Sequence, residues 1–184
     1  MTEQVLILVD KDNNQIGYAP RSVCHSGDGK MHRAFVVMLQ NDRGKFLLQK
    51  RRHALWDGFW DVSATSHTLH LEGKDETYEE AAQRCLMKEL NMRAESFKNL
   101  GAFVYFAKRG ENCENEHCSV LIARTNSTPK PNPEEVYELE WTCLEMLIME
   151  IHENPKKFTP WLVETVKLLS TGNYLEFLHK CTAD

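Results

Sequence analysis

The sequence of 184 residues lacks the features that mark membrane, secreted and nucleic-acid-binding proteins. No apolar run approaches the roughly eighteen residues that a membrane span needs. The first ten residues contain an early acidic residue and no basic leader, which argues against a secretory signal peptide. A net charge of −5 is unlike the clustered positive charge that nucleic acids require. We therefore expect a cytoplasmic protein that binds neither a membrane nor a nucleic acid.

Repeats and low-complexity segments are also missing, and the length suits one domain with its own core. We expect a single domain over residues 1–184. The six cysteines include no CxxC pair and no spacing typical of a small secreted domain, so we expect reduced thiols. The sequence leaves a monomer and a homodimer equally open.

The apolar pattern predicts strands interleaved with few helices, which indicates an α+β fold. Thr77 is a candidate N-cap with Glu80 at the capping-box spacing. The segment 125–133, rich in proline, predicts a rigid surface loop. The strands are expected at 5–9, 15–19, 34–39, 45–49, 102–107, 118–123 and 136–142, and the helices at 77–91, 144–152 and 160–170.

Three histidines and two glutamates form a candidate metal site: His25, His32, His67, Glu114 and Glu116. Imidazole and carboxylate together suit a divalent transition metal. Histidines alone would more often be ordinary surface residues. On a strand, however, the two glutamates would point to one face, as joint ligation requires. The alternative is a solvated strand edge in an acidic protein.

Several motifs follow one another in a family-specific order. They are Arg21-Ser-Val-Cys-His25, Met31-His32-Arg-Ala-Phe35, Trp56-Asp-Gly-Phe-Trp60, Ser66-His67, the segment 81–90, Glu114-Asn-Glu116 and Phe158-Thr-Pro-Trp161. In this the chain resembles the type 1 isopentenyl diphosphate isomerases, a branch of the Nudix superfamily, from about residue 5 to 169. The resemblance implies a Nudix fold, which is a mixed β-sheet sandwich between helices, and an enzyme that acts on a short isoprenyl diphosphate.

The resemblance also implies two metals. Mn²⁺ or Zn²⁺ would occupy the histidine and glutamate site, and Glu89 would hold Mg²⁺ that bridges the substrate diphosphate. The general Nudix helix signature is only partly kept. Glu76, Arg84, Leu86 and Glu89 match it, whereas Cys85, Lys88 and Asn91 stand where it has Glu, Glu and Gly. The alternative for Glu89 is a surface helix residue.

Four further residues match family positions around the substrate. Arg21 and Arg51 would bind the diphosphate, since a guanidinium fork suits phosphate oxygens. Tyr105 and Trp161 would wall the isoprenyl pocket, where an indole face can stabilise a carbocation. The alternatives are a solvated strand end for Arg51 and an ordinary core position for Trp161. Two basic residues of the family are missing here, a helix arginine that aligns with Cys85 and a residue after the Arg51 strand. Arg52, His53 or Lys88 are candidate replacements.

Thr65 is the main departure, because the isomerases have a catalytic cysteine at this position. A threonine hydroxyl makes a poor base. Glu116 or Glu89 could instead orient a metal-activated water. The sequence therefore favours hydrolysis of dimethylallyl or isopentenyl diphosphate to the monophosphate, with Glu116, Glu89, Tyr105 and Thr65 as the candidate catalytic residues. Isomerisation of the two compounds is the close alternative, and a nucleotide diphosphate enzyme or a non-catalytic binding module follow.

Overall fold

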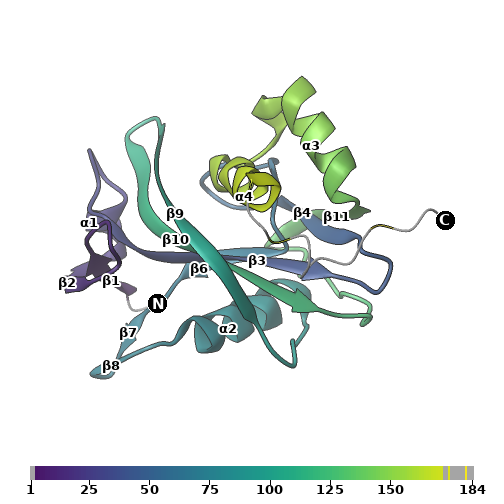
Figure 1. Cartoon of the computed structure of the whole chain (residues 1–184). Helices are drawn as coiled ribbons and strands as arrows, with labels where there is room; N and C mark the ends of the chain where they lie inside the picture. The colour runs from purple at the N-terminus through teal and green to yellow at the C-terminus, as the bar shows by residue number, and fades with distance from the viewer. Residues whose placement is uncertain (1–2, 172–173, 175–180, 182–184) are drawn as a thin grey trace.

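The structure is a computed structural model that describes residues 3–171, 174 and 181. Within these residues, nine strands form one mixed sheet, and β7 and β8 form a separate hairpin (Figure 1). The strands are β1 (Val5–Val9), β2 (Gln15–Pro20), β3 (His32–Gln40), β4 (Phe46–Arg51), β5 (Trp60–Asp61), β6 (Ala64–His67), β7 (His70–Leu71), β8 (Lys74–Asp75), β9 (Lys98–Arg109), β10 (Asn112–Arg124) and β11 (Val136–Thr142). The helices are α1 (Arg21–Cys24), α2 (Tyr78–Leu90), α3 (Leu144–Glu153) and α4 (Pro160–Thr171), with a 3₁₀ turn η1 (Pro155–Lys157).

Strands β3 and β10 form the centre of the sheet and run parallel to each other. The other pairings of these two strands, β3 with β1, β4 and β6 and β10 with β9, are antiparallel. Strand β3 is almost entirely buried, which explains its near-continuous apolar sequence. The parallel pair sets Glu116 directly opposite His32, although the two residues are far apart in the chain.

Two apolar cores cover the two faces of the sheet. Along β3, Val36 and Met38 pack toward α3 and α4, whereas Val37 and Leu39 pack toward α2. This alternation follows from the two-residue period of a strand. Figure 1 shows α2 on one side of the sheet and α3 and α4 on the other. The sheet between helices is the Nudix sandwich that the resemblance implies.

Helix α2 begins and ends with local signals that the sequence carries. Thr77 Oγ1 accepts a hydrogen bond from Glu80 N at 3.1 Å, and Thr77 N donates to Glu80 Oε2 at 2.8 Å. The predicted capping box is therefore confirmed. Asn91 ends the helix in the left-handed conformation, at φ 50°. Asparagine tolerates this conformation, so it can serve where the general signature has glycine.

The predicted long strands and helices are all present, and the α+β class is confirmed. Strands β9 and β10 are longer than predicted, and the sequence analysis did not recognise β5, β6, β7, β8, α1 or η1. The segment 125–133 lies outside helices and strands, as expected. The expectation of reduced thiols is wrong for one pair, since Cys143 and Cys181 form a disulfide. Cys24, Cys85, Cys113 and Cys118 are free and buried.

None of the helices described, over residues 3–171, is both long and apolar enough to cross a membrane.

Candidate metal centre and active site

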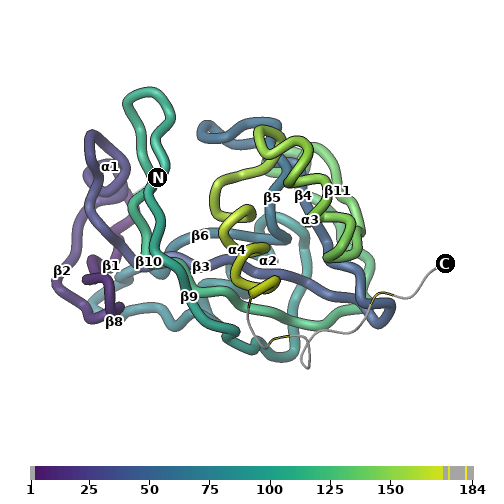
Figure 2. The backbone as a smooth tube through the Cα atoms, turned by 45° about the horizontal axis from the view of Figure 1, so that its top comes forward, coloured from purple at the N-terminus to yellow at the C-terminus, as the bar shows by residue number. Residues whose placement is uncertain are grey.

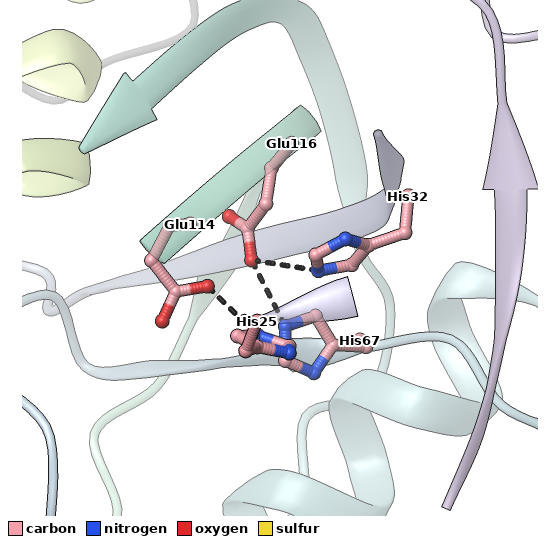
Figure 3. Close-up of side chains that lie close together, drawn as sticks. All are labelled: His25, His32, His67, Glu114 and Glu116. Atoms are coloured by element: carbon pink, nitrogen blue, oxygen red, sulfur yellow. Dashed lines mark hydrogen bonds and ion pairs between the residues drawn. The ribbon is translucent and has the colours of Figure 1, made fainter. Parts of the chain in front are cut away.

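The five predicted metal ligands converge on one point. One potential ligand atom from each of them lies within 4.8 Å of all the others, and all five residues are buried (Figure 3). His25 follows α1, His32 begins β3 and His67 ends β6. Glu114 and Glu116 alternate with Asn115 on β10 and point to the same face, as predicted. The sheet thus gathers side chains from four separate segments.

The segment between His25 and His32 is held close to β10. Cys113 N donates to His25 O at 3.0 Å, and Figure 2 shows the chain around α1 beside the β9–β10 hairpin. Gly29 is essential to this approach. It has a φ of 62°, and a Cβ atom there would lie 2.6 Å from Cys113 Sγ and 2.7 Å from Cys24 O. This glycine therefore permits both imidazoles to reach one centre.

The histidine rings are oriented by backbone carbonyl groups. His25 Nδ1 lies 2.9 Å from Arg21 O, and His32 Nδ1 lies 2.7 Å from Lys30 O. A proton on Nδ1 is required for these bonds, which leaves each Nε2 lone pair directed at the centre. Metal-ligating histidines are typically fixed in this way.

The unpaired polar atoms of the centre fit a metal ion. His25 Nε2 lies 2.9 Å from Glu114 Oε2, yet neither atom has an aligned hydrogen-bond partner among the described residues. His32 Nε2 is likewise buried without a hydrogen bond from any described residue, 3.4 Å from Glu116 Oε1. Buried polar atoms without partners are costly. Imidazole and carboxylate atoms that converge unpaired are the arrangement that a divalent transition metal would satisfy.

Burial also sets the ionisation of the centre. It lowers the pKa of His67 to about 3, so that the imidazole is neutral and able to ligate near pH 7. Burial opposes ionisation of Glu116, but His32 and His67 beside its carboxylate hold the pKa of Glu116 well below its usual range. Burial, followed by the nearby Glu116, raises the pKa of Tyr105 well above that of a free phenol. The centre thus combines a neutral His67 imidazole, an ionised Glu116 and a protonated Tyr105.

A cavity of about 440 Å³ opens beside this centre. Its lining includes the metal-centre residues His67, Glu114 and Glu116. All the other residues singled out for catalysis or substrate binding also line it: Arg21, Arg51, Thr65, Glu89, Tyr105 and Trp161. Within the cavity the Tyr105 hydroxyl donates to Glu116 Oε2 at 2.5 Å. The predicted residues therefore share one concave site large enough for a small molecule.

Glu89 faces this cavity from α2. Its Oε2 accepts a hydrogen bond from Gln49 Nε2 at 2.7 Å, and its Oε1 lies 2.9 Å from Cys85 Sγ. Burial raises the pKa of Glu89. Gln49 Oε1 is buried without a hydrogen-bond partner among the described residues. One carboxylate with an open acceptor beside it fits a hydrated Mg²⁺ that completes its shell with phosphate oxygens.

Thr65 lies on β6 with its hydroxyl occupied. Thr65 Oγ1 donates to Phe35 O at 3.0 Å. A thiol is nevertheless close by, because Cys85 Sγ lies 3.4 Å from Thr65 O and lines the cavity. Burial raises the pKa of Cys85 well above that of an ordinary thiol. Neither the Thr65 hydroxyl nor the neighbouring Cys85 thiol therefore ionises readily near neutral pH.

The three suggested replacements for the two missing basic residues differ in position. Lys88 and His53 line the cavity, but Lys88 Nζ is 2.7 Å from Glu135 Oε1. Burial and then Arg51 lower the pKa of His53 to about 4, so it is uncharged at neutral pH. Arg52 does not line the cavity and donates to Pro133 O at 2.7 Å, with its guanidinium over the Tyr137 ring. Lys88 is the remaining cationic candidate, and Arg84 adds a further guanidinium, paired to Glu76 at 2.7 Å.

Two residues of this site were not recognised from the sequence. Gln49 supports Glu89, and Asp61 pairs with Arg51 at 2.6 Å. Asp61 also accepts a hydrogen bond from Trp161 Nε1. Neither residue belongs to a motif or carries a spacing signal. Only the fold brings them to the residues that they contact.

Comparison with known proteins shows which family the chain belongs to. The NUDIX domain description matches residues 30–162, so the chain belongs to the Nudix family. Within it, the chain falls in the isopentenyl diphosphate isomerase-like branch. The isopentenyl-diphosphate Delta-isomerase of Serratia proteamaculans is 32% identical over 173 residues, which cover 92% of this chain and 93% of that protein. The enzyme of the same name from Haloarcula marismortui is 36% identical over 170 residues, covering 86% and 87%.

Solved structures support the same fold. DR0079 from Deinococcus radiodurans superposes with a TM-score of 0.69 at 23% identity, over 89% of this chain and 98% of that one. The MutT NUDIX hydrolase from Burkholderia pseudomallei gives 0.60 at 20% identity, over 76% and 98%. At this identity the likeness establishes the fold alone.

Proposed function

We propose that the chain is a divalent-metal-dependent enzyme that interconverts isopentenyl diphosphate and dimethylallyl diphosphate. The sequence alone favours hydrolysis of the same compounds, with isomerisation as the alternative. The relatives named as isomerases reverse that order, because they match 92% and 86% of this chain and include its site region. Hydrolysis remains the second candidate.

The observation that carries the proposal is the hydrogen bond of 2.5 Å from Tyr105 to Glu116, in a cavity that Trp161 also lines. Moving a double bond requires a proton donor placed next to an apolar wall. A buried tyrosine on a metal-site carboxylate meets that need, whereas phosphoanhydride hydrolysis has no evident use for either aromatic residue.

Each side chain would have a distinct task. Tyr105 keeps its proton near neutral pH and would donate it to the alkene carbon. The carbocation would lose a proton to solvent water, from which the phenolate beside Glu116 Oε2 would be protonated again. The Trp161 ring would face the carbocation that protonation creates. Arg21, Arg51 and Lys88 would bind the diphosphate, together with Mg²⁺ held by Glu89. When bound at the five-ligand centre, Mn²⁺ or Zn²⁺ would supply positive charge that increases the acidity of this proton donor.

Hydrolysis is kept because of Thr65. Its hydroxyl proton is engaged by Phe35 O, so the second alkene face lacks an evident base at this position. A chain that cannot complete the double-bond shift could still use Glu89 to orient water against the phosphoanhydride. That reaction would release inorganic phosphate.

One NMR experiment separates the two reactions. The protein is mixed with isopentenyl diphosphate, Mg²⁺ and Mn²⁺ or Zn²⁺, and ³¹P and proton spectra are recorded from the same tube. Isomerisation gives the methyl signals of dimethylallyl diphosphate with both phosphorus signals retained, whereas hydrolysis gives inorganic phosphate. The Glu116→Gln variant serves as the control. A tube in which neither change occurs would contradict both reactions.

Thr65→Cys tests whether the absence of a base at Thr65 limits proton transfer on the second face of the alkene. The thiol places an ionisable group where the alkene lacks one, so we expect a rise of roughly tenfold or more in the isomerisation rate. Thr65→Ser is the matched control and should give no rise, since it keeps a hydroxyl and adds no ionisable group. A wild type that is already as fast as the cysteine variant would show that Thr65 is not a disabling change.

A further inference from the structure

Asp61, at the end of β5, is a fully buried carboxylate with 0% exposure. It lies outside the candidate metal centre and outside the family motifs described above. A buried carboxylate is costly unless its oxygens receive several hydrogen bonds. Both oxygens of Asp61 are engaged, and the identity of their partners indicates a task in substrate binding.

The two oxygens hold different groups. Asp61 Oδ1 accepts from Trp161 Nε1 at 2.5 Å and from Thr159 Oγ1 at 2.9 Å, in addition to its neighbouring backbone N–H group at 2.7 Å. Asp61 Oδ2 accepts from a terminal guanidinium nitrogen of Arg51 at 2.6 Å. One carboxylate thus connects β4, which carries Arg51, with the start of α4, which carries Trp161.

The Arg51 guanidinium is fixed in a second way. Its Cζ atom lies 5.1 Å from the centroid of the Trp161 ring, within the range of a cation–π contact. Arg51 Nε is buried and has no hydrogen-bond partner among the described residues. Arg51 also lines the cavity. Asp61 therefore uses only one nitrogen of the Arg51 guanidinium. The buried Nε–H group remains available to donate to an anionic oxygen.

We infer that Asp61 is a positioning residue that sets the distance between the diphosphate site at Arg51 and the isoprenyl wall at Trp161. This inference rests on the proposed function and concerns how that site positions its substrate. In both isoprenyl diphosphates the branched carbon lies the same number of bonds from the diphosphate. Holding Arg51 and Trp161 on one carboxylate brings the alkene to Glu116 when the diphosphate is bound. Asp61 does not line the cavity and so would act on the substrate only through these two side chains.

A purely structural ion pair would behave differently. Its loss would lower the free energy of unfolding and leave the affinity of the folded molecule for anions unchanged. A positioning residue acts on that affinity, because misplacing a binding group by about 1 Å is enough to weaken binding and turnover.

The first test measures binding of inorganic pyrophosphate in Mg²⁺ by titration calorimetry, which requires no turnover. Asp61→Asn keeps an acceptor for Trp161 but turns an amide N–H group toward Arg51, so two donors face each other. We expect the Kd for pyrophosphate to rise roughly tenfold, with the circular dichroism spectrum unchanged. Asp75→Asn is the matched control, because it removes a carboxylate 2.6 Å from His70, and Asp75 does not line the cavity. Its Kd should equal that of the wild type.

Asp61→Glu is the second variant and covers the case in which Asp61→Asn does not fold. It keeps the negative charge and moves the carboxylate along by one methylene group. Positioning predicts weaker pyrophosphate binding and a lower kcat for isopentenyl diphosphate, whereas charge balance alone predicts wild-type values. Wild-type affinity in either folded variant would overturn the inference and leave the proposed function standing. A wild-type protein that binds no pyrophosphate in Mg²⁺ would overturn both.

Discussion

Glu116 belongs both to the candidate metal centre and to the lining of the cavity. Its Oε1 lies 2.9 Å from His67 Nε2, and its Oε2 accepts the hydroxyl of Tyr105 at 2.5 Å. A ligand at one oxygen therefore changes the proton affinity at the other. Glu89 also lines the cavity, but its partners Gln49 and Cys85 belong to a separate set. The two glutamates should consequently fail in different ways when they are altered.

His67→Asn tests the five-ligand centre. The variant loses one of three imidazoles, and we expect the tightly bound transition metal to fall to a small fraction of the wild-type content. Metal content is measured by plasma mass spectrometry after purification. His152→Asn, on the exposed end of α3, is the control and should retain its metal. Equal metal in wild type and His67→Asn would contradict the centre.

Glu89→Gln and Glu116→Gln test the division of tasks between the two carboxylates. Glu89→Gln would weaken the proposed contact to Mg²⁺ on the diphosphate, so raising Mg²⁺ should recover part of the lost activity. Glu116→Gln would remove a proposed metal ligand and the carboxylate that accepts from Tyr105 together, so added Mg²⁺ should not help. The measurement is a Mg²⁺ titration of product formation by NMR. Identical curves would place the chemistry elsewhere.

At the scale of the element, α2 carries Glu89 to the cavity and depends on its own first turn. Thr77 and Glu80 close that turn with reciprocal hydrogen bonds. Thr77→Ala removes the side-chain acceptor, and we expect a loss of about 1 kcal/mol in the free energy of unfolding. Urea unfolding followed by circular dichroism measures it. Thr77→Ser keeps the cap and should remain close to wild type. A variant Thr77→Ala as stable as wild type would mean that the capping box contributes little.

Long, regular elements could be predicted because their signals are local and repeated. The period of α2, the cap at Thr77 and the apolar run of β3 each lie within one segment. Strands of two to four residues, such as β5 and β6, carry too few residues to show a period. They are strands because β3 and β4 offer them backbone partners. The disulfide could not be predicted for a different reason. Its two cysteines are 38 residues apart, and no motif indicates that they pair.

The grouping of the candidate residues could be predicted from the family order of motifs. All five candidate metal ligands converge, and the remaining candidates line the adjoining cavity. What the sequence could not supply is the set of residues that support them. The pairing of Arg51 with Asp61 depends on β4 and β5 lying side by side. Likewise, the bond from Gln49 to Glu89 depends on α2 packing over the sheet.

At the scale of the whole molecule, the metal centre joins α1, β3, β6 and β10. A metal that binds only the folded state adds about 4 kcal/mol of stability at a thousand times its Kd. Removing it also leaves two carboxylates buried together. We expect a chelator to lower Tm by roughly 10 °C, measured by differential scanning calorimetry. The His67→Asn variant should show little further change. An unaffected wild-type Tm would contradict a structural contribution from the metal.

The parallel pairing of β3 with β10 has a consequence for the order of events during synthesis. His32 reaches Glu116 only after the intervening strands and α2 have been made, because the two ligands sit opposite each other on strands remote in sequence. Such non-local pairing closes a long loop and is slow to form. A chain still emerging from the ribosome therefore presents histidines without their carboxylates. We expect the metal to bind at the five-residue centre as one of the last steps of maturation, when the chain is already nearly folded.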